Sequence, residues 1–503
     1  MHFSIPDTQE VKGNDSTYLM YNVHINGNFH CSLRYRQFLG LHEQLRKEFG
    51  TGRVPQFPPK KFLSLSAVQL EERRCCLEKY IQNASQNSEI ASSELFTGFL
   101  RLAQHETSGE PVAKRPIDVF LPNGHQMTVD VWNNAPTSVL YKLVSQECKL
   151  RDDLAEHFGL YIFRKEPDGY WIVLRKLNEY ESPYISIKWL DDTHRIVFRK
   201  CGWDLSHDDL LMDDRVGLHM LYVQMVSDIE NGWIIVPKEV LVKQLTALQS
   251  QGSKKEYVRV ARRLKFYGYM KFPYCQSDFL QPSSELTVYI GNRELVVITP
   301  RREEISFKVT RMKCWRITLH HERNGDVKAE LSFEYLQSKD KLEWITLMSE
   351  QSVIMALCLQ EIVSDMVAKQ HPTNPSLIGV MRTKVRSVKT MFYYIRRDGD
   401  QVPLNDDIIV PKTSGSSSLS NCSSGNSSPT THSLSNGCST SSAAATPTSS
   451  LTRNNSYDVP STLGITKRRP SNNSLCRQSS VINSNDNLFH ENSAFAGIGD
   501  DDL

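Results

Sequence analysis

The first fifty residues alternate between apolar and polar positions in the way that paired strands do. Residues from Tyr18 to Ile25 follow a period of two, and Asn26-Gly27 comes next as a hairpin turn signal. The following apolar residues fit one face of a second strand and then one stripe of a helix: Cys31, Leu33 and Tyr35, then Phe38, Leu41, Leu45 and Phe49. The pattern predicts a β-hairpin that runs directly into an amphipathic helix.

A proline-rich stretch interrupts this first unit. Pro55 to Pro59 predicts an extended loop, because each proline ring fixes φ and biases the preceding residue away from the helical region. Helical periodicity resumes over residues 66–83 and 92–104, which predicts two further helices. Residues 1–108 are therefore expected to form one small domain.

A second hairpin follows a short linker. Residues 117–121 and 127–131 alternate on either side of a Pro-Asn-Gly turn. A helix that Thr137 can cap and a closing strand near residues 196–198 complete a strand–hairpin–helix–strand order. This order predicts a ubiquitin-like lobe over residues 115–204.

Two more regions follow, one helical and one rich in strands. Residues 205–271 are expected to be helical, and Ser253 to Glu256 fits a capping box at the start of the last helix. Residues 272–370 contain six segments of strand length and then one long helix over residues 350–369. The strand segments are 286–290, 295–299, 307–310, 315–320, 327–336 and 342–347.

The remainder of the chain has a different composition. Between Thr413 and Thr452 there is no charged and no aromatic residue. Such a segment cannot bury enough apolar surface to offset the loss of conformational entropy, so residues 371–490 are predicted to be a mostly disordered linker. Residues 491–503 combine an aromatic residue, an aliphatic residue and an acidic run, which suggests a short recognition peptide on a tether.

Overall composition narrows the class of protein. Across 503 residues, 59 Lys and Arg face 57 Asp and Glu, so an anionic partner has to be met by a local patch. No run of eighteen apolar residues and no signal-peptide core occurs, and the 11 scattered cysteines suggest reduced thiols. The sequence has no G-x-S-x-G, P-loop, H-E-x-x-H or zinc spacing, which argues against an enzyme, a metal site and a cofactor.

The domain order resembles a known family. Residues 1–108 resemble a PX domain, and residues 115–370 resemble a FERM domain with ubiquitin-like, helical and phosphotyrosine-binding-like lobes. PX followed by FERM is similar to one subgroup of the sorting nexins. The resemblance implies an α+β multidomain fold: a PX domain with a three-stranded sheet plus helices, the three FERM lobes at 115–204, 205–271 and 272–370, and a disordered tail.

The same resemblance implies an endosomal cargo adaptor. It would lie in the cytoplasm and peripherally on the cytosolic face of early endosomes. Its partners would be phosphatidylinositol 3-phosphate membranes, cytoplasmic tails of receptors of the lipoprotein-receptor and integrin type, and the retriever complex. The chain would act as a monomer, without a cofactor and without nucleic acid.

Three cationic positions around one aromatic ring suit a phosphorylated, ring-shaped headgroup. Arg34 offers a planar fork that keeps its charge at any relevant pH. The resemblance implies that Arg34 contacts the 3-phosphate, Tyr35 packs on the inositol ring, Lys60 meets the 1-phosphate, and Arg73 contacts the ring hydroxyls. Taken alone, Arg34 and Arg73 would be interpreted as surface ion-pair residues, whereas all three elements together at PX spacing favour the lipid site.

The third FERM lobe is expected to bind peptide by strand addition along residues 315–320. The implied ligands have the form Asn-Pro-x-Tyr or Asn-x-x-Tyr. Trp315, Leu336, Val363 and Val367 are the candidates for the peptide groove, and each is equally compatible with ordinary core. Because no Arg cluster stands out, unphosphorylated peptide is expected to suffice.

The C-terminal residues carry two further hypotheses. Ile498, Gly499, Asp500, Asp501, Asp502 and Leu503 resemble a retriever-binding segment, whereas most acidic ends are simply solvated. Asn492 and Phe495 have the Asn-x-x-aromatic spacing that the third lobe is expected to bind, so the tail could occupy the chain's own peptide groove.

The alternative function is a membrane-associated FERM scaffold in cytoskeletal or small-GTPase signalling. It would need a basic face on the first lobe, for which Arg115, Lys142 and Lys149 are the candidates. Cortical actin rather than early endosomes would then be the expected location.

Overall fold

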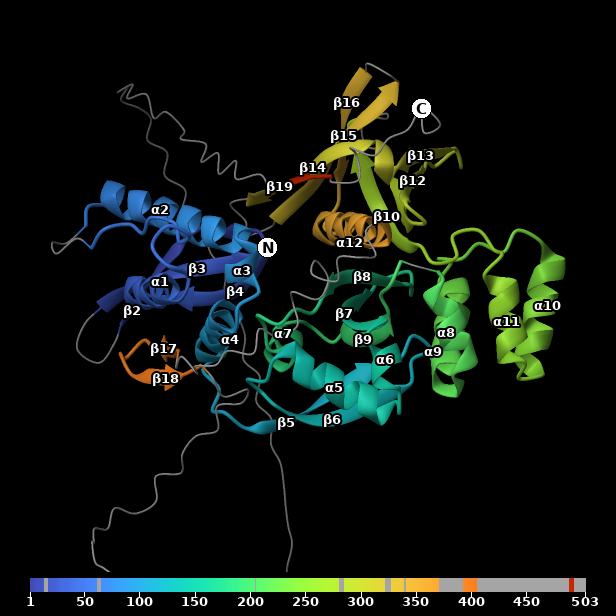
Figure 1. Cartoon of the computed structure of the whole chain (residues 1–503), viewed down its shortest axis with the longest axis horizontal. Coiled ribbons are helices and arrows are strands. Elements are labelled where there is room, and N and C mark those ends of the chain that lie inside the picture. Colours follow the sequence, from blue (N-terminus) through green and yellow to red (C-terminus); the bar gives the residue numbers. More distant parts are fainter. Residues whose placement is uncertain are drawn as a thin grey trace, which may run out of the picture. The chain divides into compact units, whose positions relative to one another are not determined.

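The computed structural model describes residues 1–12, 17–60, 65–203, 205–279, 285–321, 327–338, 341–370, 392–404 and 488–492 (Figure 1). Within these ranges, no helix combines the length and apolar character that a membrane crossing requires. No cluster of His, Cys, Asp and Glu suited to a metal ion occurs there either.

The first domain is a small antiparallel sheet flanked by helices. Strand β3 (Thr17–Ile25) pairs with β1 (Phe3–Ser4), β2 (Thr8–Lys12) and β4 (Asn28–Leu33), so the sheet has four strands and not three. Its helices are α1 (Tyr35–Phe49), α2 (Ala67–Gln86), α3 (Ser88–Ala91) and α4 (Glu94–Ser108). Asn26 and Gly27 both have positive φ, 53° and 81°, which confirms the predicted hairpin turn.

The second unit has the order expected of a ubiquitin-like lobe. Five strands form a sheet in the order β6-β5-β9-β7-β8, in which only β5 and β9 among the described strands pair in parallel. These are β5 (Lys114–Phe120), β6 (Gln126–Trp132), β7 (Phe158–Lys165), β8 (Trp171–Lys176) and β9 (His194–Lys200). The helices are α5 (Thr137–Glu147), α6 (Asp152–Ala155) and α7 (Pro183–Lys188).

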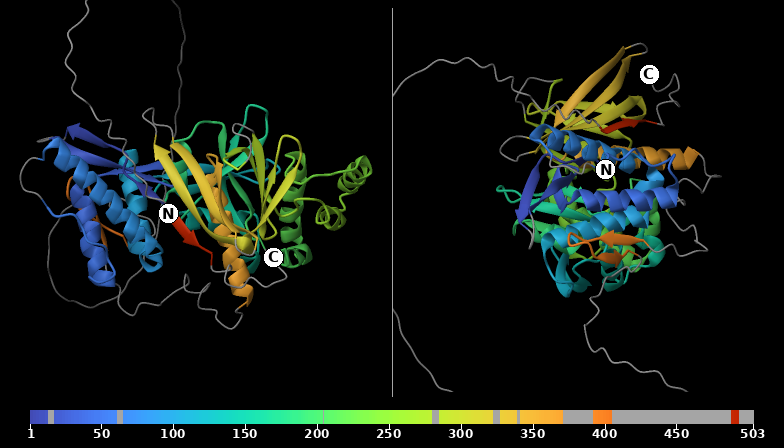
Figure 2. Two further views of the ribbon diagram at one scale, coloured as in Figure 1. Left: turned by 90° about the horizontal axis from the view of Figure 1, so that it is seen from above. Right: turned by 90° about the vertical axis from the view of Figure 1, so that its left-hand side faces the viewer.

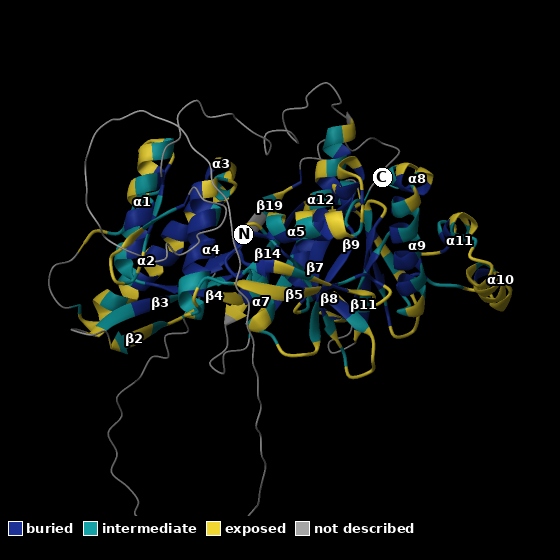
Figure 3. Ribbon diagram, turned by 90° about the horizontal axis from the view of Figure 1, so that it is seen from below, coloured by how far each residue is buried: buried dark blue, intermediate teal, exposed yellow. Residues whose placement is uncertain are grey.

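The third unit is helical, as predicted. It contains α8 (His207–Asp213), α9 (Arg215–Glu230), α10 (Glu239–Ser250) and α11 (Lys254–Ala261). Helix α10 is largely exposed and buries only Leu245 among its residues (Figure 3). The predicted capping box was wrong, because the Ser253 side chain makes no capping hydrogen bond to α11. Thr137 was also misplaced as a cap, since it is the first helical residue and its hydroxyl donates to Asn178 O at 2.7 Å.

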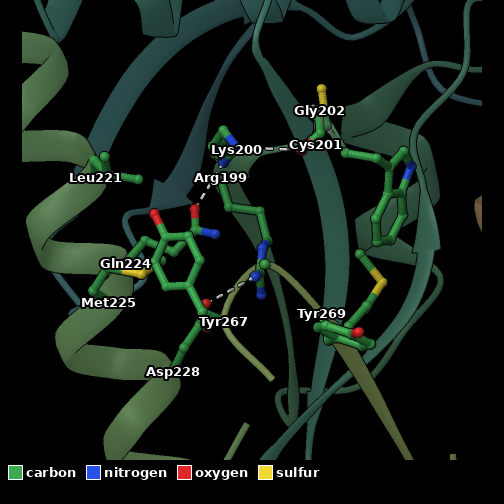
Figure 4. Close-up of a pocket in the computed structure, with 13 residues that line it drawn as sticks. Arg199, Lys200, Cys201, Gly202, Leu221, Gln224, Met225, Asp228, Tyr267 and Tyr269 are labelled. Atoms are coloured by element: carbon green, nitrogen blue, oxygen red, sulfur yellow. Dashed lines mark hydrogen bonds and ion pairs between the residues drawn. The ribbon is translucent and has the colours of Figure 1, made fainter. Parts of the chain in front are cut away.

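A small, partly open pocket of 30 Å³ lies where β9 meets α9 (Figure 4). Arg199 Nη2 donates to Asp228 Oδ2 at 3.2 Å, and Lys200 N donates to Gln224 Oε1 at 2.8 Å. Arg199 pairs with Asp228 and Lys200 pairs with Asp208, and the space is about that of one water. These contacts join β9 to α8 and α9.

The fourth unit is an antiparallel sheet covered by one helix. Its strands are β10 (Met270–Ser277), β11 (Leu286–Gly291), β12 (Glu294–Ile298), β13 (Glu304–Lys308), β14 (Met312–His321), β15 (Val327–Ser338) and β16 (Lys341–Met348). Helix α12 (Ser352–Gln370) follows. Met355, Leu359, Ile362, Val363 and Met366 of α12 are all buried in the core, as the sequence predicted.

Two ordered pieces occur inside the range that was predicted to be mostly disordered linker. Strands β17 (Tyr393–Ile395) and β18 (Gln401–Pro403) form a hairpin. Strand β19 (Leu488–Glu491) adds to the edge of the large sheet, in the order β13-β12-β11-β10-β16-β15-β14-β19 (Figure 1, Figure 2).

Candidate functional site

The candidate headgroup site centres on the ring of Tyr35 at the start of α1. The Tyr35 hydroxyl donates to Pro58 O at 2.8 Å, which ties the ring to the extended proline loop. The Arg73 guanidinium lies 4.6 Å from the centre of the Tyr35 ring, within cation–π distance. Phe57 packs on the other rings of the site, 5.5 Å from Tyr35 and 4.9 Å from His42. The fold therefore brings an aromatic ring and one predicted cation together.

Arg34 lies beside this group but has its own partners. It precedes α1, and its backbone N–H donates to Gln37 Oε1 at 2.9 Å. Its guanidinium sits 3.9 Å from the centre of the Tyr18 ring, and Nη1 donates to Arg397 O at 2.6 Å. Burial, together with Arg36, lowers the pKa of Arg34, although a guanidinium remains charged at neutral pH.

The neighbouring arginines of α2 have different roles. Arg74 is 4 % exposed and bonds Glu71, Glu78 and the carbonyl of Ile5, so it holds the N-terminal strand to α2. Arg73 is half-buried, and its Nη2 has no hydrogen-bond acceptor among the described residues. Arg73 and Arg74 are adjacent in sequence but have different roles. Arg74 is structural, and Arg73 is the candidate cation of the headgroup site.

Lys60 is exposed at the end of the proline loop. The structure thus joins Tyr35 to Arg73 and places Arg34 directly before Tyr35 at the start of the same helix.

The candidate peptide site is the side of β14 that does not pair with β15. Strand β19 occupies it in antiparallel register, with Cys314 opposite Glu491, Trp315 opposite His490 and Ile317 opposite Leu488. We call the segment Cys314–Ile317 the β14 edge. Helix α12 packs against β14 and β15.

Asn492 anchors the end of β19. Its backbone N–H donates to Lys313 O at 3.0 Å. Its side-chain amide donates to Val309 O at 2.8 Å and to Met312 O at 2.6 Å, and the residue is 5 % exposed. A buried side-chain amide that satisfies two carbonyls selects asparagine at this position.

The side chains of Trp315 and His490 are in contact across this pair. The two rings are stacked with centres 5.9 Å apart. Burial lowers the pKa of His490 to about 4, so the docked imidazole is neutral at neutral pH.

Of the other predicted groove residues, Val363 and Val367 lie at the core beside Trp315, and Leu336 does not. Val363 is buried in the same core cluster as Trp315, and Val367 packs against that cluster. Leu336 lies near the end of β15, opposite Leu342. Because Tyr335 points into the core, strand alternation directs Leu336 to the opposite face, so the structure does not bring Leu336 together with the other three.

The remaining predictions concern the tail and the first FERM lobe. Phe495 and residues 498–503 lie outside the described residues. Arg115 on β5, Lys142 on α5 and Lys149 just after α5 are all exposed.

Comparisons with known proteins agree with the domain order. Residues 21–103 match the PX domain, and residues 115–203 match the F1 lobe of the sorting nexin 17/27/31 FERM domain. Residues 204–265 match the F2 lobe of the sorting nexin 17/31 FERM domain, and residues 268–367 match the Sorting Nexin 17 FERM C-terminal domain. The chain belongs to the PX–FERM sorting nexins.

Individual relatives place the chain within that family. It is 44% identical to Sorting nexin-17 of Danio rerio over 389 residues, 74% of this chain and 82% of that protein. It is 31% identical to Sorting nexin-31 of Homo sapiens over 392 residues, 75% of this chain and 88% of that protein. The solved X-ray structure of a designed CISK-PX domain is 34% identical, covering 20% of this chain and 97% of that one, with a TM-score of 0.18. This PX–FERM sorting nexin is therefore close to Sorting nexin-17.

Proposed function

We propose that this PX–FERM sorting nexin is a non-enzymatic endosomal cargo adaptor. Its PX domain would bind phosphatidylinositol 3-phosphate, and its third FERM lobe would bind Asn-Pro-x-Tyr and Asn-x-x-Tyr motifs in receptor tails. The family assignment supports the general function, because the chain matches the PX and FERM domain models and is 44% identical to Sorting nexin-17 of Danio rerio.

The observation that carries the peptide assignment is β19 on the β14 edge. An extended segment followed by a buried asparagine is the pattern by which a receptor tail would bind through strand addition. Backbone pairing to Cys314–Ile317 supplies affinity for any extended chain, whereas the two bonds of the asparagine amide supply selectivity.

The test is calorimetry of the full-length protein with an unphosphorylated Asn-Pro-x-Tyr receptor-tail peptide. Replacement of the peptide asparagine by alanine should weaken binding about 5- to 150-fold, because the two carbonyls lose their donor. The tyrosine-phosphorylated peptide should bind no more tightly. Equal affinity of the alanine peptide, or a clear preference for phosphate, contradicts the assignment.

The tail segment from β19 onward is proposed to occupy the cargo site in the absence of cargo. Asn492 supports this, and Phe495 has the spacing for the aromatic position of the motif. Cargo and tail would then compete, so cargo binding would free the C-terminus. If Phe495→Ala leaves cargo affinity of the full chain unchanged, the aromatic position plays no part in this competition.

The lipid assignment rests on the cations around Tyr35. Arg34→Ala should release the protein from liposomes that contain phosphatidylinositol 3-phosphate, because the headgroup loses its guanidinium. Glu89→Ala is a control, since Glu89 is exposed and pairs only with exposed Arg53 among its described contacts. Unchanged co-sedimentation of Arg34→Ala would remove Arg34 from the site.

Residues 498–503 are proposed to engage the retriever complex once the tail is free. The acidic run and terminal carboxylate call for a basic surface, and Ile498 and Leu503 call for apolar pockets. Deletion of Leu503 should abolish retriever pull-down while cargo affinity stays the same.

A further inference from the structure

The hairpin β17–β18 packs into the core of the first domain, although nearly three hundred residues separate them in sequence. Tyr394 and Leu404 are 2 % and 1 % exposed and belong to the same hydrophobic cluster as Phe38 and Phe99. The Tyr394 ring lies 5.5 Å from that of Phe99. Apolar side chains buried this completely are part of a domain and not of a linker.

Polar groups of the first domain are satisfied by the hairpin backbone. Gln44 on α1 accepts from Tyr393 N at 2.6 Å and donates to Tyr393 O at 2.5 Å, as a neighbouring strand would. Gln37 is fully buried and donates to Ile395 O at 2.9 Å. The Tyr394 hydroxyl donates to Glu106 Oε2 at 2.7 Å. Without the hairpin, Gln44 would lose both bonds to Tyr393, and buried Gln37 would lose its acceptor Ile395 O.

The close approach depends on a glycine in the middle of α1. A Cβ atom on Gly40 would overlap Ile395 Cδ1 and lie 3.1 Å from Ile395 Cγ1. Glycine is otherwise unfavourable inside a helix, so its presence fits a position where the Ile395 side chain packs against the helix.

The hairpin turn meets the candidate headgroup site. Arg397 O accepts from Arg34 Nη1 at 2.6 Å, and Arg396 O accepts from Arg36 Nη2 at 3.0 Å. The Arg397 side chain in turn donates to Ser32 O at 3.0 Å and to Thr107 Oγ1 at 2.8 Å. One donor of Arg34 is thereby held by a backbone carbonyl, and no described residue takes the other donors of its guanidinium, which are open to a ligand.

We propose that residues 392–404 are a second segment of the PX domain and position the Arg34 guanidinium for the 3-phosphate of the headgroup. The positioning role rests on the proposed lipid-binding function. Arg397, which follows the FERM domain in sequence, thus orients Arg34 in the domain that precedes it. A guanidinium that is already oriented loses less conformational freedom when it binds phosphate.

The test uses full-length protein and two readouts. Hydrogen exchange of the hairpin amides measures docking independently of lipid, and binding to liposomes with phosphatidylinositol 3-phosphate measures positioning. Gly40→Leu should raise exchange across residues 392–404 and lower liposome affinity about two- to tenfold, the cost of ordering one long side chain on binding. Adding Ile395→Ala to Gly40→Leu should restore both, because it removes the overlapping atoms. Gln401→Ala, at an exposed position of β18, should change neither.

The outcomes separate this proposal from the lipid assignment. Fast exchange of the hairpin amides in the unmodified protein, or failure of Ile395→Ala to rescue, overturns the two-segment domain. Increased exchange in Gly40→Leu with equal or higher liposome affinity overturns the positioning role, provided that Arg34→Ala reduces affinity. If Arg34→Ala has no effect, the lipid assignment itself fails and the positioning role fails with it, whereas protected hairpin amides would still establish the two-segment domain.

Discussion

Asn492→Ala should weaken the docking of the tail on the β14 edge. The substitution removes two buried hydrogen bonds, to Val309 O at 2.8 Å and to Met312 O at 2.6 Å. At about 0.5–1.5 kcal/mol for each neutral bond, docking loses about 1–3 kcal/mol. Since about 1.4 kcal/mol is a factor of ten, the docked population should fall about 5- to 150-fold relative to the free one.

The consequence for cargo follows from competition for one site. If the tail occupies the β14 edge most of the time, the measured cargo affinity is reduced by the small fraction of open molecules. Asn492→Ala should therefore tighten binding of an Asn-Pro-x-Tyr peptide by up to the same factor. Calorimetry of the two full-length proteins measures it, and hydrogen exchange of Cys314–Ile317 should rise in parallel.

Glu491→Ala is the matched control, because Glu491 is an exposed neighbour on the same strand and its backbone pairing with Cys314 is kept. It should leave affinity unchanged. Equal peptide affinity and equal exchange in Asn492→Ala would refute occupancy of the edge by the tail. Increased exchange with unchanged affinity would show that the peptide binds elsewhere.

Further predictions concern pH and stability. His490 has a pKa of about 4 when docked, against an ordinary value of 6.5, so docking is strongest above pH 6.5 and weakens as pH falls toward 4. Cargo affinity measured by calorimetry should accordingly rise as pH falls from about 7 to about 5, and His490→Gln should flatten that rise. Asp208→Asn should lower the free energy of unfolding by about 3–5 kcal/mol in a denaturant titration, because it leaves buried Lys200 without its carboxylate. Asp209→Asn, at an exposed neighbour, should change it by less than about 0.5 kcal/mol. An equal effect of the two variants would contradict the importance of the buried pair.

Local elements of the fold were predictable because their signals lie within a few residues. The turn at Asn26-Gly27 adopts the positive φ values that its residue types favour. The stripe of α12 faces the core because the apolar period matches the helix. The strand predicted at 307–310 shifted to β13, Glu304–Lys308, because Val309–Arg311 forms a 3₁₀ turn before β14. Element ends depend on such contacts more than on periodicity.

The hairpin at 392–404 was missed although a signal was present. Asp398-Gly399 between aromatic or β-branched residues is a turn signal, and Gly399 adopts a φ of 112°. Two short strands are marginal on their own, so the turn signal alone does not predict order there. Order comes from Tyr394 and Leu404, which are buried only because α1 and α4 are present.

By itself, the sequence determined the types of the elements, the order of the domains and the residue types suited to an anion and to an extended peptide. Only the tertiary structure decided that Arg74 is structural while Arg73 faces Tyr35, that a carbonyl 363 residues away holds Arg34, and that β19 fills the β14 edge. The physical reason is the range of the interactions. Periodicity and turn preference are local properties of the chain, whereas hydrogen-bond partners and burial are set by segments that meet only when the chain folds.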